Sequence, residues 1–288
     1  MKIIQVSDPS GSRNNEDLIA IYTHNTGIVD MLIFDGATSV SERNYFDTVV
    51  GDVAWFVSAF SERLRGIVAA GLSQGESVTL ALSRLRRDLQ DRLELSSIQP
   101  YAYPIAAMTW IRISHGNNTA TVNIYALGDC KVYLLNEANE VVDLDPHVNP
   151  QENILKEAIG RLRMQDIVDE KVIFEKLLPM LRERRAFQNA SERPTILCLF
   201  PQGDFEAREY AFEMAAQSQL LAMTDGFYRL VDTYALYSAE ELVRRCARGD
   251  LSLLLQELRS FERENIAAGT TSVKASDDAS AVMYRGEC

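Results

Sequence analysis

The chain has 288 residues, of which 47% are hydrophobic and 24% charged, with 15 glycines and 8 prolines. This composition is typical of an ordinary globular protein and excludes collagen-like, disordered and disulfide-stapled classes. The formal net charge of −12 repels the phosphate backbone that supplies most nonspecific nucleic-acid affinity, so nucleic acid is not expected as a partner. The same acidity is compatible with a site that collects divalent cations.

The cysteines and the first residues indicate a reducing compartment. Four cysteines lie far apart and form no Cys-x-x-Cys pair, and the opening MKIIQVSDPS has no apolar leader. We therefore expect free thiols and a cytoplasmic location. No apolar stretch approaches the roughly 18 residues of a membrane span, so no membrane association is expected.

Short apolar or alternating runs predict strands along most of the chain. They cover residues 2–6, 18–22, 29–34, 106–113, 119–127, 131–135, 195–200, 220–224 and 279–284. Apolar residues spaced by three and four predict pairs of amphipathic helices at about 42–95 and 236–264.

The order of these elements sets the fold class. Residues 120–144 read as successive strands joined by short turns, which predicts antiparallel pairing without crossover helices. Helices in pairs, separate from the strands, favour an α+β sandwich of two mostly antiparallel sheets over a doubly wound parallel sheet.

Residues 148–193 interrupt the strand pattern with charged, helix-prone sequence. We expect a single domain over 1–288 in which 148–193 is a helical insertion or flap over one edge. Its basic run LRERR (181–185) is typical of a solvated helix face. The functional alternative is that this run contacts a phosphorylated partner.

Acidic residues stand at the ends of five predicted strands. Taken singly, an Asp-Gly pair after a strand is a common turn signal. Taken together, the strand ends of one sandwich can bring these carboxylates to the same edge. The residues are Glu16 and Asp17, Asp35 before Gly36, Asp129 after Gly128, Asp225 before Gly226, and Asp277 with Asp278.

Such a cluster needs countercharge. Two carboxylates 4 Å apart repel by about 4 kcal/mol at an effective dielectric constant of 20. Oxygen ligands suit Mg²⁺ or Mn²⁺, and two such ions about 3.5–4 Å apart can bind a phosphate and acidify a bridging water. The pattern therefore predicts metal-assisted phosphate chemistry.

Five ordered motifs resemble those of a known family over nearly the whole chain. They are RNNED (13–17), IFDGATS (33–39), ALGDCKVYLL (126–135), LLAMTDGF (220–227) and SDDASAV (276–282). This succession is similar to the metal-dependent protein phosphatases, the protein phosphatase 2C family of serine/threonine phosphatases. The resemblance implies a four-layer α-β-β-α sandwich flanked by helix pairs, with a binuclear Mn²⁺ or Mg²⁺ site at one edge.

The resemblance also implies an activity: hydrolysis of phosphoserine or phosphothreonine esters in a protein by a metal-bridging water. Partners would be a phosphorylated protein and a cognate serine/threonine kinase, in signalling by dephosphorylation. The alternative function is that of a catalytically weak module of the same fold, which senses metal or binds a phosphoprotein. A second rival is a two-metal nuclease or small-molecule phosphatase, which the acidic charge disfavours.

Position by position, the resemblance implies a ligand set for the first metal. Asp35 corresponds to the carboxylate that bridges both metals, and the carbonyl of Gly36 to the ligand beside it. Asp225 and Asp277 correspond to the remaining ligands, with the neighbouring Asp278 as the alternative register to Asp277.

The remaining assignments concern the second metal and the substrate. Glu16 corresponds to the second-metal ligand, and Asp17 to a residue that holds metal-bound water. Asp129, together with Asp225, corresponds to a site for a third, weaker ion. Arg13 is the candidate for the substrate phosphate, because a guanidinium makes bidentate bonds to phosphate oxygens.

The sequence departs from the family pattern in four places, one of which is Asp278, where the family frequently has asparagine after the metal ligand. Arg13 lies two residues before Asn15 instead of three. Ala37, Thr38 and Ser39 replace the usual glycine pair, so no histidine can act as general acid there, and PIAAM (104–108) replaces a GTT-like stretch.

Competing motifs are weaker. GLSQG (71–75) fits a nucleophile elbow formally, but the preceding IVAA is a poor strand, and an interhelical loop with a serine cap is favoured. DLDPH (143–147) lacks the context of an aspartyl-phosphate site. A cysteine-dependent phosphatase is excluded because no arginine stands six positions after any cysteine.

Overall fold

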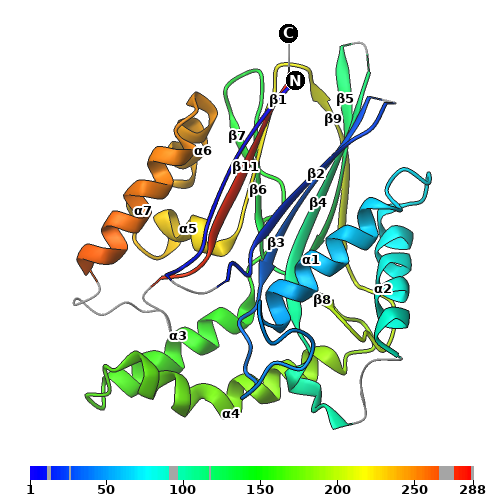
Figure 1. The fold of residues 1–288 in the computed structure, drawn as a ribbon. Coiled ribbons are helices and arrows are strands. Elements are labelled where there is room, and N and C mark those ends of the chain that lie inside the picture. The colour runs from blue at the N-terminus through cyan, green and yellow to red at the C-terminus, as the bar shows by residue number, and fades with distance from the viewer. Residues whose placement is uncertain (12–13, 26, 91–96, 117, 266–275, 287–288) are drawn as a thin grey trace.

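Two antiparallel sheets form the centre of the molecule in a computed structural model, which describes all residues except 12–13, 26, 91–96, 117, 266–275 and 287–288 (Figure 1). The first sheet has the order β1 (Lys2–Asp8), β11 (Ala279–Arg285), β10 (Gln219–Met223), β6 (Lys131–Leu135) and β7 (Val141–Asp143). The second has the order β2 (Leu18–Thr23), β3 (Ile28–Gly36), β4 (Ile105–His115), β5 (Thr119–Leu127) and β9 (Arg208–Ala215), with β8 (Leu197–Cys198) beside β4.

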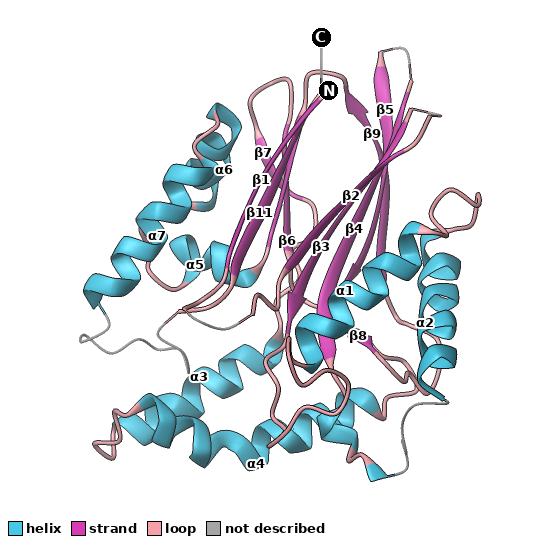
Figure 2. Cartoon of the chain, viewed as in Figure 1, coloured by secondary structure: helices cyan, strands magenta, loops and turns pink. Residues whose placement is uncertain are grey.

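Helices cover the outer face of each sheet (Figure 2). The second sheet is covered by α1 (Asp52–Arg65) and α2 (Gln74–Gln90), and the first by α5 (Asp225–Asp232), α6 (Ala239–Arg248) and α7 (Leu251–Asn265). These layers confirm the predicted α-β-β-α sandwich.

Strand β3 shows why the predicted runs were so apolar. Ile33 points between the two sheets and Phe34 points toward α1, because successive strand residues face opposite sides. Both side chains are at most 1% exposed, and each contributes about 1.5–3 kcal/mol by its burial. A strand buried on both faces loses the alternation of a half-exposed strand, which explains the continuous run VDMLIF.

Three elements differ from the sequence prediction. The strand predicted over 195–200 is only Leu197–Cys198, and α5 begins at Asp225, where only a strand end was predicted. Strand β9 was missed because its inward residues alternate with charged ones, as in Glu209 and Glu213. An edge strand needs only one apolar face, and its sequence signal is correspondingly weak.

The competing motifs take structural roles. Residues 67–70 are turns, so no strand precedes GLSQG, and the Ser73 hydroxyl accepts a bond of 3.2 Å from the Glu76 backbone at the start of α2. In DLDPH, Asp145 is buried and pairs with Arg208 at 2.6 Å. Neither motif has the context of a reactive site.

Helices α3 (Pro150–Arg163) and α4 (Glu170–Asn189) lie within the predicted insertion and extend across one end of the sandwich (Figure 1). They pack on each other through a small apolar cluster of Ile159, Ile173 and Leu177. Short 3₁₀ helix η2 (Pro100–Ala102) contacts α4, where the Asn189 amide donates to the carbonyl of Pro100 at 3.0 Å. None of the helices within the described ranges combines the length and apolar character needed to cross a membrane.

Candidate metal centre

The strand register explains why distant acidic residues meet at one edge. In the second sheet Leu18 pairs with Phe34 and Met108 with Leu127, so the start of β2 and the ends of β3 and β5 lie together. In the first sheet Met223 pairs with Ala281, which brings the end of β10 to the start of β11. The residues that flank these strand ends are Glu16, Asp17, Asp35, Asp129, Asp225, Asp277 and Asp278.

The glycines beside these acids serve close packing more than turning. A Cβ on Gly36 would lie 2.5 Å from the Glu16 carbonyl, and one on Gly226 would lie 1.9 Å from the Asp278 carbonyl. Neither glycine has a positive φ. Gly128 has φ +85°, and its Cβ would overlap Ala107. Only glycine allows the backbones that carry the acids to approach this closely.

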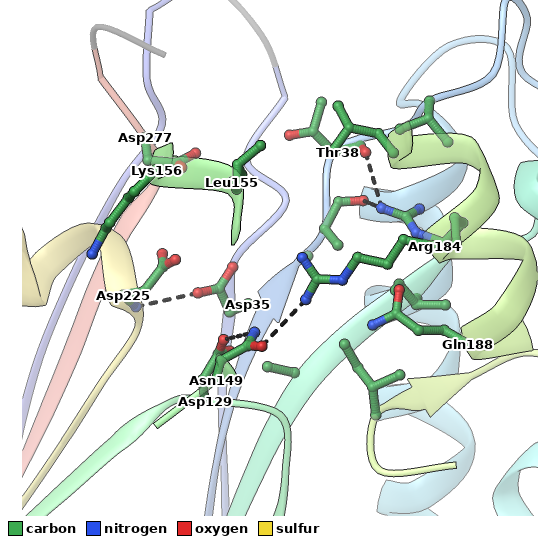
Figure 3. A pocket seen from close by; sticks show the side chains of 18 of the residues that line it. Asp35, Thr38, Asp129, Asn149, Leu155, Lys156, Arg184, Gln188, Asp225 and Asp277 are labelled. Atoms are coloured by element: carbon green, nitrogen blue, oxygen red, sulfur yellow. Dashed lines mark hydrogen bonds between the residues drawn. The ribbon is translucent and has the colours of Figure 1, made fainter. Parts of the chain in front are cut away.

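Residues that follow β10 donate hydrogen bonds to carboxylates of the second sheet at this edge. The backbone N–H of Asp225 donates to Oδ2 of Asp35 at 3.2 Å (Figure 3). The hydroxyl of Thr224, the N-cap residue of α5, donates to Oδ2 of Asp17 at 2.9 Å. Asp35 lies in β3 of the second sheet, and Asp17 directly precedes β2 of the same sheet. Thr224 and Asp225, which follow β10 of the first sheet, therefore hold both carboxylates.

Asp277 and Asp278 take different positions, which bears on the register that the sequence left open. Asp278 is buried and accepts the backbone N–H groups of Ser10 and Glu16 at 2.8 and 2.6 Å. Asp277 lines the cavity beside Asp35 and Asp225. Asp278 therefore holds the segment before β2, and Asp277 is the carboxylate that faces the site.

Two other predicted ligands contact neutral side chains. Thr38 donates its hydroxyl to Oε2 of Glu16 at 2.7 Å. Asn149 donates its side-chain amide to Oδ2 of Asp129 at 2.8 Å, and its own Oδ1 caps α3 by accepting from Gln151 at 3.1 Å. The first helix of the insertion is thus attached to the acidic edge.

The acidic side chains disfavour one another's ionised forms. Burial raises the pKa of Asp35 well above its ordinary value, and the charges of Asp225, Asp17, Asp129 and Asp277 raise it further. Burial, followed by the Asp277 and Asp129 charges, raises the pKa of Asp225 to about 7. Carboxyl groups that repel each other in this way need a compensating positive charge to ionise together.

A cavity of about 320 Å³ opens between this edge and the helical insertion. Asp35, Asp129, Asp225 and Asp277 lie on one side, and Arg184 and Gln188 of α4 lie on the opposite side (Figure 3), while Leu155 and Lys156 of α3 also line the cavity. Arg13, the predicted phosphate ligand, lies outside the described residues.

The chemistry of the donor set suits hard divalent cations. All the predicted ligand atoms are oxygens, which Mg²⁺ and Mn²⁺ prefer. Within the described ranges, no three acidic, histidine or cysteine side chains are already grouped as a metal-binding set. The charges of the neighbouring aspartates act on Asp35, while Glu16 and Asp129 remain bonded to Thr38 and Asn149.

Comparisons with solved structures identify the fold. The chain matches PppA, a key regulatory component of T6SS in Pseudomonas aeruginosa, with a TM-score of 0.55 and 14% identity over 99% of this chain and 97% of that chain. It matches the catalytic domain of the serine/threonine protein phosphatase PstP, solved with two manganese ions, at 0.50 and 16% over 98% and 96%. The serine/threonine phosphatase of S. agalactiae matches at 0.52 and 12% over 99% of both chains.

No protein-family model matches the sequence, and no curated protein matches it. At these identities the structural matches establish the fold, which is that of the serine/threonine phosphatases. The family resemblance predicted from the motifs is confirmed at this level.

Sequence reasoning missed the polar residues that surround the acids. Thr38 stood only as a departure from a glycine pair, and Asn149 falls in a segment interpreted as an insertion. The one available signal for Asn149 was the N-cap preference for asparagine before Pro150.

Proposed function

We propose that the chain is a metal-dependent phosphomonoesterase that acts on phosphoserine or phosphothreonine in a protein. The observation that carries this proposal is the convergence of Asp35, Asp129, Asp225 and Asp277 on one cavity, where burial and the neighbouring negative charges raise the pKa of Asp35 and of Asp225. The fold shared with PstP, whose structure contains two manganese ions, supports it.

The residues present fit two Mn²⁺ or Mg²⁺ ions. Asp35, which Asp225 and Asp277 flank, would be the shared ligand, with the carbonyl of Gly36 beside it. Glu16 would hold the second ion, and Asp17 would orient its hydration. Asp129 and Asp225 would hold a third, weaker ion. When bound, such cations polarise phosphoryl oxygens and acidify water.

The protein's own contribution is to hold its acids rigidly in place. Asp35 ends a strand buried on both faces and accepts the Asp225 N–H. Asp17 is fixed by Thr224. The aspartates therefore need no large rearrangement of the sheets to act, as preorganised electrostatic catalysis requires. The substrate would be a phosphoprotein, with a serine/threonine kinase as the opposing activity in signalling.

A second function is a phosphoprotein-binding module with weak turnover. The hydrogen bonds that Thr38 and Asn149 donate to Glu16 and Asp129 favour it, because they occupy two of the proposed ligand carboxylates. PppA, described as a regulatory component, has the same fold.

One experiment separates these functions. Hydrolysis of a phosphoserine and phosphothreonine peptide set, p-nitrophenyl phosphate and oligonucleotides is measured with and without Mn²⁺. Mn²⁺-dependent release of phosphate from the peptides supports the proposal. Binding of the peptides without turnover supports the binding module, and cleavage of oligonucleotides contradicts both.

A further inference from the structure

The basic run LRERR, which the sequence left between two interpretations, divides into arginines with different surroundings on α4. Arg182 donates to the Val40 carbonyl at 2.9 Å and reaches the exposed Glu42 at 3.3 Å. Arg185 is only 7% exposed and donates to the carbonyls of Ala37 and Thr38 at 3.3 and 3.2 Å. Arg184 reaches into the cavity, where it contacts Asn149 (Figure 3).

The helical repeat directs Arg184 to this position. Leu181, Arg184, Arg185 and Gln188 all line the cavity, and their spacing of three and four residues places them on one side of α4. The buried Arg185 fixes this side against the segment that follows Asp35. Burial lowers the pKa of Arg185 to about 10, which leaves it charged at neutral pH. Arg184 is therefore presented by an anchored turn of the helix.

The contact that Arg184 makes with Asn149 is a modest one. Its guanidinium donates to the neutral Oδ1 of Asn149 at 3.3 Å, at the long end of the hydrogen-bond range. The same Asn149 contacts Asp129, so the guanidinium lies one residue away from the acidic edge. A phosphate group offers a guanidinium two charged oxygens and a shorter, bidentate contact.

The opposite walls of the cavity fit the two sides of one phosphate monoester. Oxygens that face the acidic edge would be held by the proposed cations, while the remaining phosphoryl oxygen would face Arg184 of α4, which lines the other side of the cavity (Figure 3). We propose that Arg184 binds the substrate phosphate from the helical insertion, replacing its contact with Asn149 when substrate enters. This rests on the proposed function and adds a substrate-binding residue outside the five sequence motifs.

The test compares Arg184→Ala with Arg184→Lys and with two controls. Arg161→Ala removes an arginine of α3 that is 76% exposed and pairs only with Glu157 among the contacts described for it. Lys156→Ala removes an exposed cation of α3 that also lines the cavity. Binding of inorganic phosphate with Mg²⁺ present is measured by calorimetry, and kcat and KM are measured on a phosphopeptide with Mn²⁺.

We expect Arg184→Ala to weaken phosphate binding and to lower kcat/KM by about 10- to 100-fold, the scale of one hydrogen bond to a charged group. Metal affinity and the thermal midpoint should stay near those of the wild type. Arg184→Lys should recover part of the loss, because it keeps the charge but not the bidentate geometry. Arg161→Ala should behave like the wild type.

The outcomes separate this inference from the proposed function. If Arg184→Ala binds phosphate and turns over substrate like the wild type, or if only Lys156→Ala weakens phosphate binding, the assignment is wrong while the phosphatase function stands. If the wild type hydrolyses no phosphoester but binds phosphate in a way that depends on Arg184, the assignment stands and the enzymatic function fails.

Discussion

Replacing Gly226 by alanine tests whether close backbone packing positions the acidic residues. Gly226 is the second residue of α5 and has no positive φ. By intrinsic propensity alone, alanine in a helix is favoured over glycine by about 1 kcal/mol. If the Asp-Gly pair were only a turn signal, the substitution would therefore be harmless or stabilising.

The structure predicts the opposite sign. An added Cβ would lie 1.9 Å from the carbonyl oxygen of Asp278, where ordinary contacts begin at 3.4 Å. The oxygen belongs to backbone at the entry of β11, so α5 and β11 must separate by roughly 1.5 Å to relieve the overlap, at a cost of about 1–3 kcal/mol or more. Asp225 and Asp277 lie beside the two clashing residues, and displacement on the scale of 1 Å costs about 10²-fold in rate.

The assay combines Mn²⁺ affinity by calorimetry, turnover of a phosphopeptide, and the thermal midpoint in metal-free buffer. Gly160→Ala is the matched control, because Gly160 lies in α3 and nothing lies within 4 Å of its added Cβ. This control should gain about 0.5–1 kcal/mol of stability with normal turnover. A Gly226→Ala protein that is as stable as the wild type and binds Mn²⁺ with the same affinity would refute the packing argument.

Four further outcomes follow from the site. Asp35→Asn should lower turnover by at least about 10³-fold, since one main electrostatic element is lost. The thermal midpoint in metal-free buffer should not fall. Near-normal turnover would remove Asp35 from the centre of the mechanism. In metal-free buffer, thermal denaturation should show stability falling as pH rises from 4 to 7. The pKa of Asp225 is about 7 in the folded protein, against 3.8 ordinarily, so in this range the folded protein holds a proton that the unfolded chain has lost. The free energy of unfolding should therefore fall by at most about 4 kcal/mol. A flat profile would contradict this prediction. Asp145→Asn should destabilise the fold by about 2–4 kcal/mol in denaturant titration, because it leaves Arg208 without its carboxylate partner, whereas an unchanged midpoint would show that the pair contributes nothing. Thiol alkylation should leave turnover intact, because Cys130 is 1% exposed and burial raises its thiol pKa; inactivation with stoichiometric labelling at Cys130 would oppose this.

The sandwich could be predicted because helices cover the outer face of both sheets. Nearly every strand therefore appears in the sequence as an apolar run. The sequence could not predict β9, whose one apolar face alternates with Glu209 and Glu213, and it predicted β8 over 195–200, where only Leu197–Cys198 form the strand. Strand order also lay beyond it, since the pairing of β1 with β11 joins residues from opposite ends of the chain.

The acidic residues of the site could be predicted as a set, because each stands at a strand end and the motif order adds specificity. Their partners could not, because hydrogen bonds such as Thr38 to Glu16 depend on loop geometry that no spacing encodes. The separate positions of Asp277 and Asp278 likewise required coordinates, since a register shift of one residue exchanges inward and outward carboxylates. The assignments of metal ligands, the single domain and the role of Arg13 stay predictions.

The strand pairing that brings the acidic residues together also determines when during synthesis they can come into contact. Glu16 lies near the beginning of the chain, whereas Asp277 immediately precedes β11, the strand inserted between β1 and β10. A nascent chain still lacking β11 leaves β1 without its partner strand and the acidic edge without Asp277 and Asp278. Contacts between such distant segments form late and slowly. The ribosome must therefore release the chain through β11 before the acidic edge is complete, and a fragment that ends before Asp277 lacks two of its acidic residues.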